Sequence, residues 1–185
     1  MIPRTTAYAY TDIVQGIASA LDYGVDTMRI CRGRLPGDLI SQLVARDVYL
    51  ISELSEYKML NMEDPSNFDY VTDSALVQIL DNLRRFVSAG GKVALGDPVL
   101  NFFRTNFMPV LEIELMQQAG MTPMQILVAG TQNAAHVCNL EQELGTLEVG
   151  KIADILVVAG DPLQNIHALL NVQLVMRSGV VIYSN

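Results

Sequence analysis

Four short strand-like segments alternate with helix-like segments through the first part of the chain. Strands are predicted, from their β-branched, aliphatic and aromatic residues, at residues 5–10, 25–30, 48–54 and 92–96. Helices are predicted, from apolar residues at helical spacing, at residues 13–23, 38–46, 72–89 and 109–120, with two shorter ones inside 120–137. This alternation indicates an α/β fold with a parallel sheet, because parallel neighbours need a long crossover connection between them.

The predicted strands are mostly apolar, as expected for parallel strands that are buried on both faces. Two architectures fit this pattern: a doubly wound sheet, or part of a (β/α)8 barrel. A complete barrel needs eight strand–helix units and typically ~250 residues. This chain has 185 residues and four such units. The polar segment 55–71 is predicted to be an irregular loop.

The pattern changes after Gly145, where strands follow one another without long helices between them. The strand segments are ADILVVAG (153–160), VQLVMRSG (172–179) and VVIYS (180–184). Ser178 and Gly179 are predicted to form a hairpin turn between the last two. We therefore expect two parts, residues 1–140 and a β-rich tail at residues 141–185.

Composition narrows the classes of partner. The net charge is −8 and no basic stripe is present, which argues against nucleic-acid binding. No apolar run is long enough to span a membrane, and the N-terminus does not have the pattern of a signal peptide. Two distant cysteines, Cys31 and Cys138, are expected to be free thiols in a reducing, cytoplasmic environment. Half of the residues are hydrophobic, which favours contact with another chain.

Five segments, taken in chain order, resemble the second half of the amidohydrolase superfamily. They are AYTD (9–12), ALDYGVDTM (20–28), DNLRRFVSAGGKVALGD (81–97), ELMQQAGMTPMQILVAGTQNAA (114–135) and GTLEVGKIADILVVAGDPLQNI (145–166). The resemblance is nearest the branch that includes imidazolonepropionases and Xaa-Pro dipeptidases. It implies that residues 1–140 form half of a TIM-type (β/α)8 barrel, equivalent to strands five to eight. It also implies a partial C-terminal β-sandwich in residues 141–185, in a chain truncated of the barrel's first half.

The same resemblance implies a chemistry. The family hydrolyses C–N bonds in amides, peptides or cyclic amides, using zinc or another divalent metal that activates a bound water. In this half of the barrel, the family places metal-binding histidines at the ends of strands five and six. The matching positions hold Tyr8 and Ile30 here. We therefore expect no metal cofactor in this chain, and impaired catalysis by the chain alone.

The strand-eight motif of the family, Gly-Thr-Asp, reads Gly-Asp-Pro at residues 96–98. Either Asp97 is the catalytic aspartate after a one-residue deletion, or Pro98 takes its position. Asp97 is the predicted catalytic residue, and it could pair with Glu53 at the end of the preceding strand. The predicted substrate-binding residues are Tyr8, Glu53 and Arg32.

Other residues near these strand ends are expected to be structural. Arg29 and Arg32 flank the end of one strand and could hold an anion, although loop arginines usually face solvent. Cys31 is expected to be a packed thiol rather than a nucleophile. The two histidines of the chain, His136 and His167, are expected to lie away from the barrel mouth.

The sequence leaves three hypotheses for function and several partners open. The first is an amidohydrolase-like protein with degenerate chemistry, and the second is a non-catalytic protein that binds a small molecule or acts as a scaffold. The third is a truncated gene product that folds but has no selected function. A half-barrel would leave two open strand edges and one uncovered apolar face. A second copy, a separate chain with the missing strands, or helices repacked across both faces would cover them. We expect a homo-oligomer or a partner chain.

Overall fold

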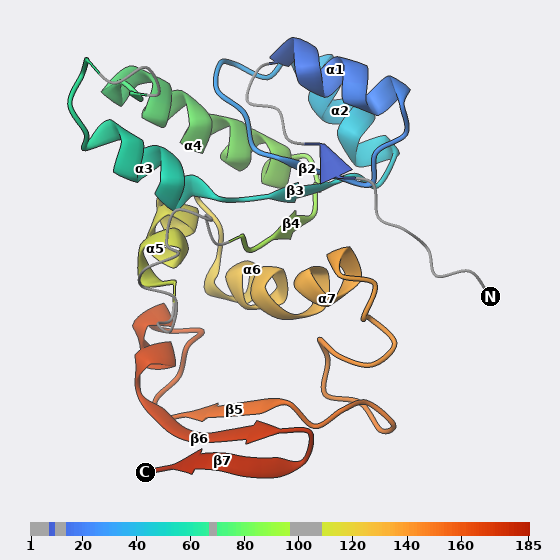
Figure 1. Ribbon diagram of the computed structural model, residues 1–185, viewed down its shortest axis with the longest axis vertical. Coiled ribbons are helices and arrows are strands. Elements are labelled where there is room, and N and C mark those ends of the chain that lie inside the picture. The colour runs from blue at the N-terminus through green and yellow to red at the C-terminus, as the bar shows by residue number, and fades with distance from the viewer. Residues whose placement is uncertain (1–7, 10–13, 67–69, 97–108) are drawn as a thin grey trace.

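The computed structural model describes residues 8–9, 14–66, 70–96 and 109–185 (Figure 1). The helices are α1 Val14–Asp22, α2 Gly37–Ala45, α3 Leu54–Asn61, α4 Asp73–Ser88, α5 Val110–Gln118, α6 Pro123–Val128 and α7 Ala134–Val137, with a π-helical turn η2 Ala129–Asn133 and a 3-10 helix η3 Ile166–Leu170. The strands are β1 Tyr8–Ala9, β2 Thr27–Arg29, β3 Tyr49–Ile51, β4 Val93–Ala94, β5 Ile155–Val158, β6 Val172–Arg177 and β7 Val180–Ser184. None of the helices in these ranges is both long and apolar enough to cross a membrane.

The first four strands form one parallel sheet in the order β1-β2-β3-β4, which confirms the predicted α/β fold. Each strand pairs in parallel with its neighbour in sequence, and helices lie in the connections between them. Met28 lies opposite Leu50 in the register, and Leu50 lies opposite Val93. All three side chains are buried in the main hydrophobic core, together with apolar residues of α1, α2 and α4.

Helices of the same chain lie on more than one side of the sheet. In Figure 1, α1 to α4 lie above the strands, and α6 and α7 lie beside β4. All three residues of β2 and both residues of β4 are buried. The expectation of an uncovered apolar face is therefore not met at these two strands.

The outer edge of β4 is also occupied. The backbone N–H of Leu95 donates to the carbonyl of Ala129 at 3.0 Å. The side chain of Asn133 donates from Nδ2 to the carbonyl of Val93 at 2.7 Å. Both partners belong to η2, a π-helical turn inside one continuous helical run with α6 and α7. This edge, expected to be open, is closed by a helix that supplies the hydrogen bonds of a missing strand.

One predicted loop contains a helix. Residues 55–71 were expected to be irregular, yet α3 occupies their first part. Its residues Leu54, Tyr57 and Leu60 recur at a spacing of three and are all buried, so they form an apolar face. The polar residues between them hide this pattern in the sequence.

The last three strands form a separate antiparallel sheet in the order β5-β6-β7. Ser178 and Gly179 connect β6 to β7 with φ values of 49° and 79°. Two consecutive positive φ angles are typical of the tight hairpin turn that was predicted. Unlike the first sheet, this one is half-buried or exposed along its whole length, and all five residues of β7 are exposed.

Candidate functional site

The carboxyl ends of β2, β3 and β4 meet at one edge of the parallel sheet, where this architecture places its binding residues. Arg29 is the last residue of β2, Glu53 follows β3 by two positions and Gly96 follows β4. A Cβ atom on Gly96 would lie 2.7 Å from Cγ of Glu53 and 2.5 Å from Cγ2 of Ile51. Glycine at this position therefore lets the chain after β4 pass close against Glu53.

Arg29 forms a buried ion-pair network with two glutamates. Its Nε lies 3.3 Å from Oε2 of Glu53, and its terminal nitrogen donates to the carboxylate of Glu56. The side chain of Arg29 is only 3% exposed, and each glutamate side chain is 15% exposed. One guanidinium thus holds two carboxylates in a region that is largely shielded from water, where charges interact more strongly than at the surface.

Tyr57 on α3 completes this cluster. The guanidinium carbon of Arg29 lies 4.6 Å from the centroid of the Tyr57 ring, and that of Arg32 lies 5.7 Å from it. The Tyr57 hydroxyl donates to the backbone carbonyl of Ile30 at 2.8 Å. The ring therefore holds two arginines by cation–π contact and fixes the end of β2. We call Arg29, Glu53, Glu56 and Tyr57 the strand-end cluster.

The backbone at Glu53 is left-handed, with φ 42° and ψ 33°. A glutamate rarely adopts this conformation, and strain of order 1 kcal/mol or more is expected unless the surroundings enforce it. Here the turn leads from β3 directly into α3, whose first two backbone N–H groups are held in place from another element. The strained turn brings both Glu53 and Glu56 to Arg29.

The group that holds the start of α3 is the carboxylate of Glu112, on α5. It accepts hydrogen bonds from the backbone N–H groups of Leu54 at 2.9 Å and Ser55 at 2.7 Å. Such a carboxylate satisfies the exposed donors at a helix N-terminus and interacts well with the helix dipole. Burial raises the pKa of the Glu112 carboxyl, while hydrogen bonds from Ser52, Ser55 and Leu54 oppose the rise.

Sequence reasoning missed Glu112 and the burial of Arg29. Glu112 precedes Leu115 and Met116 by three and four residues, so helical periodicity places it on their buried face. Arg29 was expected to flank a loop and face solvent; this is wrong, because Glu53 and Glu56 enclose its guanidinium. The alternation of β2 gave a signal, since Thr27 and Arg29 share one face of a strand buried on both sides.

The predicted site residues have different outcomes. Asp97, the predicted catalytic residue, lies outside the described residues, and so does its pairing with Glu53. Tyr8 begins β1 and lies opposite Thr27 in the register. Glu53 is engaged with Arg29, and Arg32 is half-buried beside Tyr57 rather than fully exposed to solvent.

Four residues that were expected to be structural lie outside the strand-end cluster. Ile30 and Cys31 are completely buried in the core, so the expectation of a packed thiol at Cys31 is confirmed. His136 stacks on the ring of Tyr49 with centroids 4.7 Å apart. Tyr49 is the first residue of β3, so His136 lies at the opposite end of that strand from Glu53. His167 is in η3, with Nε2 3.7 Å from Oε1 of Glu114.

The described strand-end residues do not suit a catalytic divalent metal. Within the described ranges, no group of three or more His, Cys, Asp or Glu side chains is arranged to hold a metal ion. The two carboxylates of the strand-end cluster, Glu53 and Glu56, already contact the guanidinium of Arg29. Its positive charge disfavours the binding of a metal cation at the same place. The side chain of Ile30 has no atom that could bind a metal ion.

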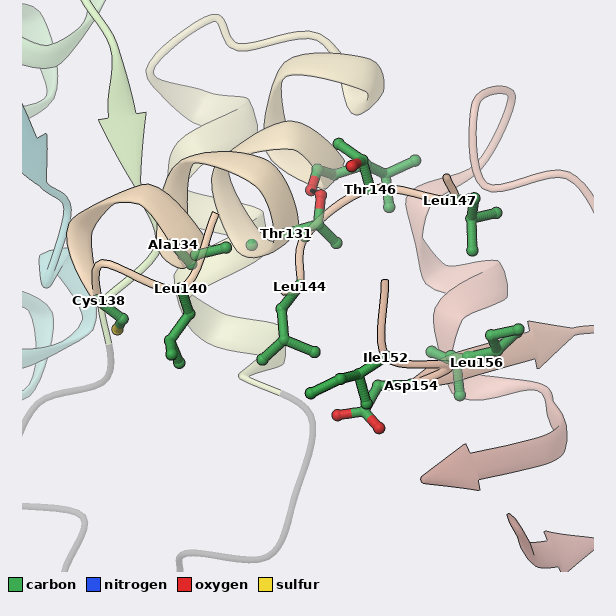
Figure 2. Close-up of a pocket in the computed structure, with 15 residues that line it drawn as sticks. Thr131, Ala134, Cys138, Leu140, Leu144, Thr146, Leu147, Ile152, Asp154 and Leu156 are labelled. Carbon is green, nitrogen blue, oxygen red and sulfur yellow. Dashed lines mark hydrogen bonds between the residues drawn. The ribbon is translucent and has the colours of Figure 1, made fainter. Parts of the chain in front are cut away.

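A separate cavity of about 600 Å³ lies between the α6–α7 helical run and the beginning of the C-terminal sheet (Figure 2). Three of its labelled aliphatic side chains, Leu140, Leu144 and Ile152, come from the connection between α7 and β5. Asp154 and the exposed thiol of Cys138 also line it. Cavities of this size and apolar character commonly accept small organic molecules.

Comparison with known proteins places this fold in a family. The sequence model of the Amidohydrolase family matches residues 58–182, which is most of the chain. The chain belongs to the amidohydrolase family. Among curated amidohydrolase relatives, the imidazolonepropionase of Geobacillus sp. (strain WCH70) is 38% identical over 79 residues, covering 40% of this chain and 18% of that protein. The imidazolonepropionase of Shouchella clausii (strain KSM-K16) is 30% identical over 105 residues, covering 55% and 24%.

Solved amidohydrolase structures share the fold at low sequence identity. A Xaa-Pro dipeptidase with methionine bound in its active site superposes with a TM-score of 0.82 at 22% identity, covering 98% of this chain and 45% of that one. The A. niger ochratoxinase superposes with a TM-score of 0.80 at 19% identity, covering 97% and 42%. This chain therefore spans less than half the length of these relatives.

Proposed function

We propose that this amidohydrolase-family chain does not hydrolyse C–N bonds on its own. The observation that carries the proposal is the strand-end cluster, in which Arg29 contacts both Glu53 and Glu56 next to Ile30, one of the two positions where the resemblance implied a metal-binding histidine. A general base needs a metal-bound or otherwise activated water to deprotonate. The described strand ends offer a buried guanidinium and the aliphatic Ile30 instead.

The proposal includes an architectural part. We take the four parallel strands to be counterparts of barrel strands five to eight, with residues 1–140 as half of a (β/α)8 barrel and residues 141–185 as part of a β-sandwich. Coverage of nearly the whole chain, but less than half of the Xaa-Pro dipeptidase, supports this correspondence.

A turnover assay tests the proposal. The purified 185-residue chain is supplied with zinc or manganese and offered Xaa-Pro dipeptides and an imidazolone propionate, the substrate classes named by its relatives. We expect no hydrolysis above the protein-free rate. Metal-dependent hydrolysis by the chain alone contradicts the proposal. Hydrolysis only after a second polypeptide with the remaining barrel strands is added supports it and identifies the chain as half of an enzyme.

The cavity in Figure 2 favours a second candidate function, the binding of an apolar small molecule without turnover. The chain contains a built-in reporter, because Cys138 lines the cavity and is exposed whereas Cys31 is buried. Anilinonaphthalene sulfonate is the first probe. We expect it to slow alkylation of Cys138 in the wild type, and to have less effect in Ala134→Leu, which narrows the cavity. Equal protection in both proteins contradicts binding there.

A further inference from the structure

The cavity between the α6–α7 helical run and the C-terminal sheet has a single charged side chain among the described residues that line it. The lining consists mostly of leucine, isoleucine, alanine and glycine, and its polar members are Thr131, Cys138, Thr146 and Asp154. Of these, only Asp154 carries a charge. Figure 2 shows Asp154 next to Ile152, at the border with the C-terminal sheet. A molecule that fills this cavity therefore has aliphatic neighbours and one carboxylate.

The threonine hydroxyls of the cavity are already bonded within the protein. Thr131 donates from Oγ1 to the carbonyl of Leu127 at 2.6 Å, and Oγ1 of Thr146 accepts from the ammonium group of Lys151. The same ammonium group donates to the carbonyl of Leu144 at 3.3 Å, so two of its three N–H groups are in use. These polar groups therefore have partners without any ligand.

The carboxylate of Asp154 still has the capacity to accept more hydrogen bonds. Its Oδ1 accepts from the backbone N–H of Ser178 at 2.7 Å, which holds the side chain against the turn between β6 and β7. A carboxylate offers about four lone-pair sites in total. Among the residues that the structure describes, Asp154 forms no ion pair with a lysine, arginine or histidine. Asp154 is thus anchored without being neutralised.

We propose that the cavity binds an amphipathic organic cation, an alkyl or aryl amine. Its apolar body would contact Leu140, Leu144 and Ile152, and its ammonium group would contact Asp154. This proposal rests on the second candidate function above, binding without turnover, and adds the class of ligand. A volume of about 600 Å³ suits a small organic molecule. The net charge of −8 also favours the approach of a cation over that of an anion of the same shape.

Three compounds with the same alkyl chain, octylamine, octanol and octanoate, test the class of ligand. Each is added before iodoacetamide, an uncharged reagent, and the alkylation rate of Cys138 is followed as the compound is titrated. Octylamine is cationic at neutral pH, as the lysine side chain is. We expect octylamine to protect Cys138 at the lowest concentration, followed by octanol and then octanoate. Sodium chloride should reduce the advantage of octylamine over octanol, because salt screens exposed charges.

Asp154→Asn removes the charge but keeps an oxygen that can accept from the N–H of Ser178. It should weaken octylamine binding about two- to fivefold, as expected for the loss of an exposed ion pair, and leave octanol binding unchanged. Anilinonaphthalene sulfonate, an anion, should bind more tightly to Asp154→Asn than to the wild type.

Asp161→Asn is the matched control. Asp161 is also exposed, and its Oδ1 also accepts from a backbone N–H, that of Leu163 at 2.9 Å. It does not belong to the lining of the cavity. Asp161→Asn therefore removes the same amount of charge and should leave the preference for octylamine unchanged.

The possible outcomes separate the class of ligand from binding itself. Equal protection by octylamine and octanol in the wild type, or a preference for octylamine that survives in Asp154→Asn, contradicts the cationic ligand and leaves apolar binding standing. Strongest protection by octanoate also contradicts it and identifies the ammonium group of Lys151 as the anchor. No protection by any of the three compounds contradicts both the cationic ligand and the second candidate function.

Discussion

Arg29 is the residue on which the strand-end cluster depends. It is the only cation among the three charged members of that cluster, and it contacts Glu53, Glu56 and the Tyr57 ring. A buried ion pair adds little net stability relative to apolar residues of similar size, but removing one partner leaves the other charge buried and uncompensated. Arg29 therefore matters less as a source of stability than as the counter-ion of two carboxylates.

Replacing Arg29 by methionine should lower the free energy of unfolding by about 3–5 kcal/mol, because two shielded carboxylates lose their counter-ion. Urea unfolding measures the loss. Arg34→Met is the control: the Arg34 side chain is 66% exposed and 3.7 Å from Asp81, so its loss should change stability by about 1 kcal/mol or less. Adding Glu53→Gln and Glu56→Gln to Arg29→Met should recover much of the stability. No recovery would show that the ion pairs are not the cause.

Glu112 gives stability a pH dependence with a definite sign. Because burial raises its pKa in the folded protein above the usual 4.5, the folded state holds this proton more tightly than the unfolded state. The associated stability is present at low pH and is lost as pH rises through the raised folded-state pKa. Between about pH 4 and about pH 8, the contribution of Glu112 to the free energy of unfolding should therefore fall as the pH rises. Urea unfolding midpoints measure this fall, and Glu112→Gln should remove it. An unchanged profile in that variant contradicts this assignment.

At the scale of elements, the sequence predicted whatever depended on local pattern. The helix at residues 72–89, the capping residue Thr122 and the Ser178-Gly179 turn all follow from neighbours in sequence, and all are observed. The start of α3 could not be predicted in this way, because its cap is Glu112, on a helix that is distant in sequence. The covered edge of β4 was missed for the same reason, since Asn133 reaches it from a later helix.

Asn82 on α4, whose side chain is completely buried, holds in place the segment that follows β2. Its Oδ1 accepts from the N–H of Leu35 at 2.9 Å, and its Nδ2 donates to the carbonyls of Cys31 and Gly33. This segment includes Arg32, so the position of a predicted binding residue is set by a helix far away in sequence. One amide side chain therefore bonds two buried backbone groups, of Leu35 and Cys31, and the part-buried carbonyl of Gly33.

Asn82→Leu should therefore cost at least about 2 kcal/mol, because the backbone groups lose their partners without losing their burial. A second readout separates loosening of this segment from general destabilisation. Cys31 is inaccessible in the wild type and should react with a thiol reagent faster in Asn82→Leu, whereas exposed Cys138 should react at the same rate in both. Arg84→Leu, an exposed position on the same helix, should leave Cys31 protected. Equal protection of Cys31 in Asn82→Leu would contradict the role of Asn82.

At the scale of the whole molecule, the two sheets differ in kind. Strands β2 and β4 of the parallel sheet are buried, whereas the C-terminal sheet has an exposed apolar strand and a cavity at its border. The sequence predicted the order of the elements but placed the uncovered surface on the parallel sheet. It could not show that the α6–η2–α7 run closes the outer edge of β4, because this depends on contacts between distant segments.

The metal content of the chain tests the central claim most directly, namely that Arg29 and its glutamates occupy the strand ends in place of a metal-assisted site. The measurement is elemental analysis of protein purified without a chelator or a nickel column, followed by dialysis against zinc and repeated analysis. We predict far less than one zinc, iron, manganese or nickel per chain both before and after dialysis. About one tightly held metal per chain would contradict the account, and Glu53→Gln and Glu56→Gln would then show whether the strand-end carboxylates hold it.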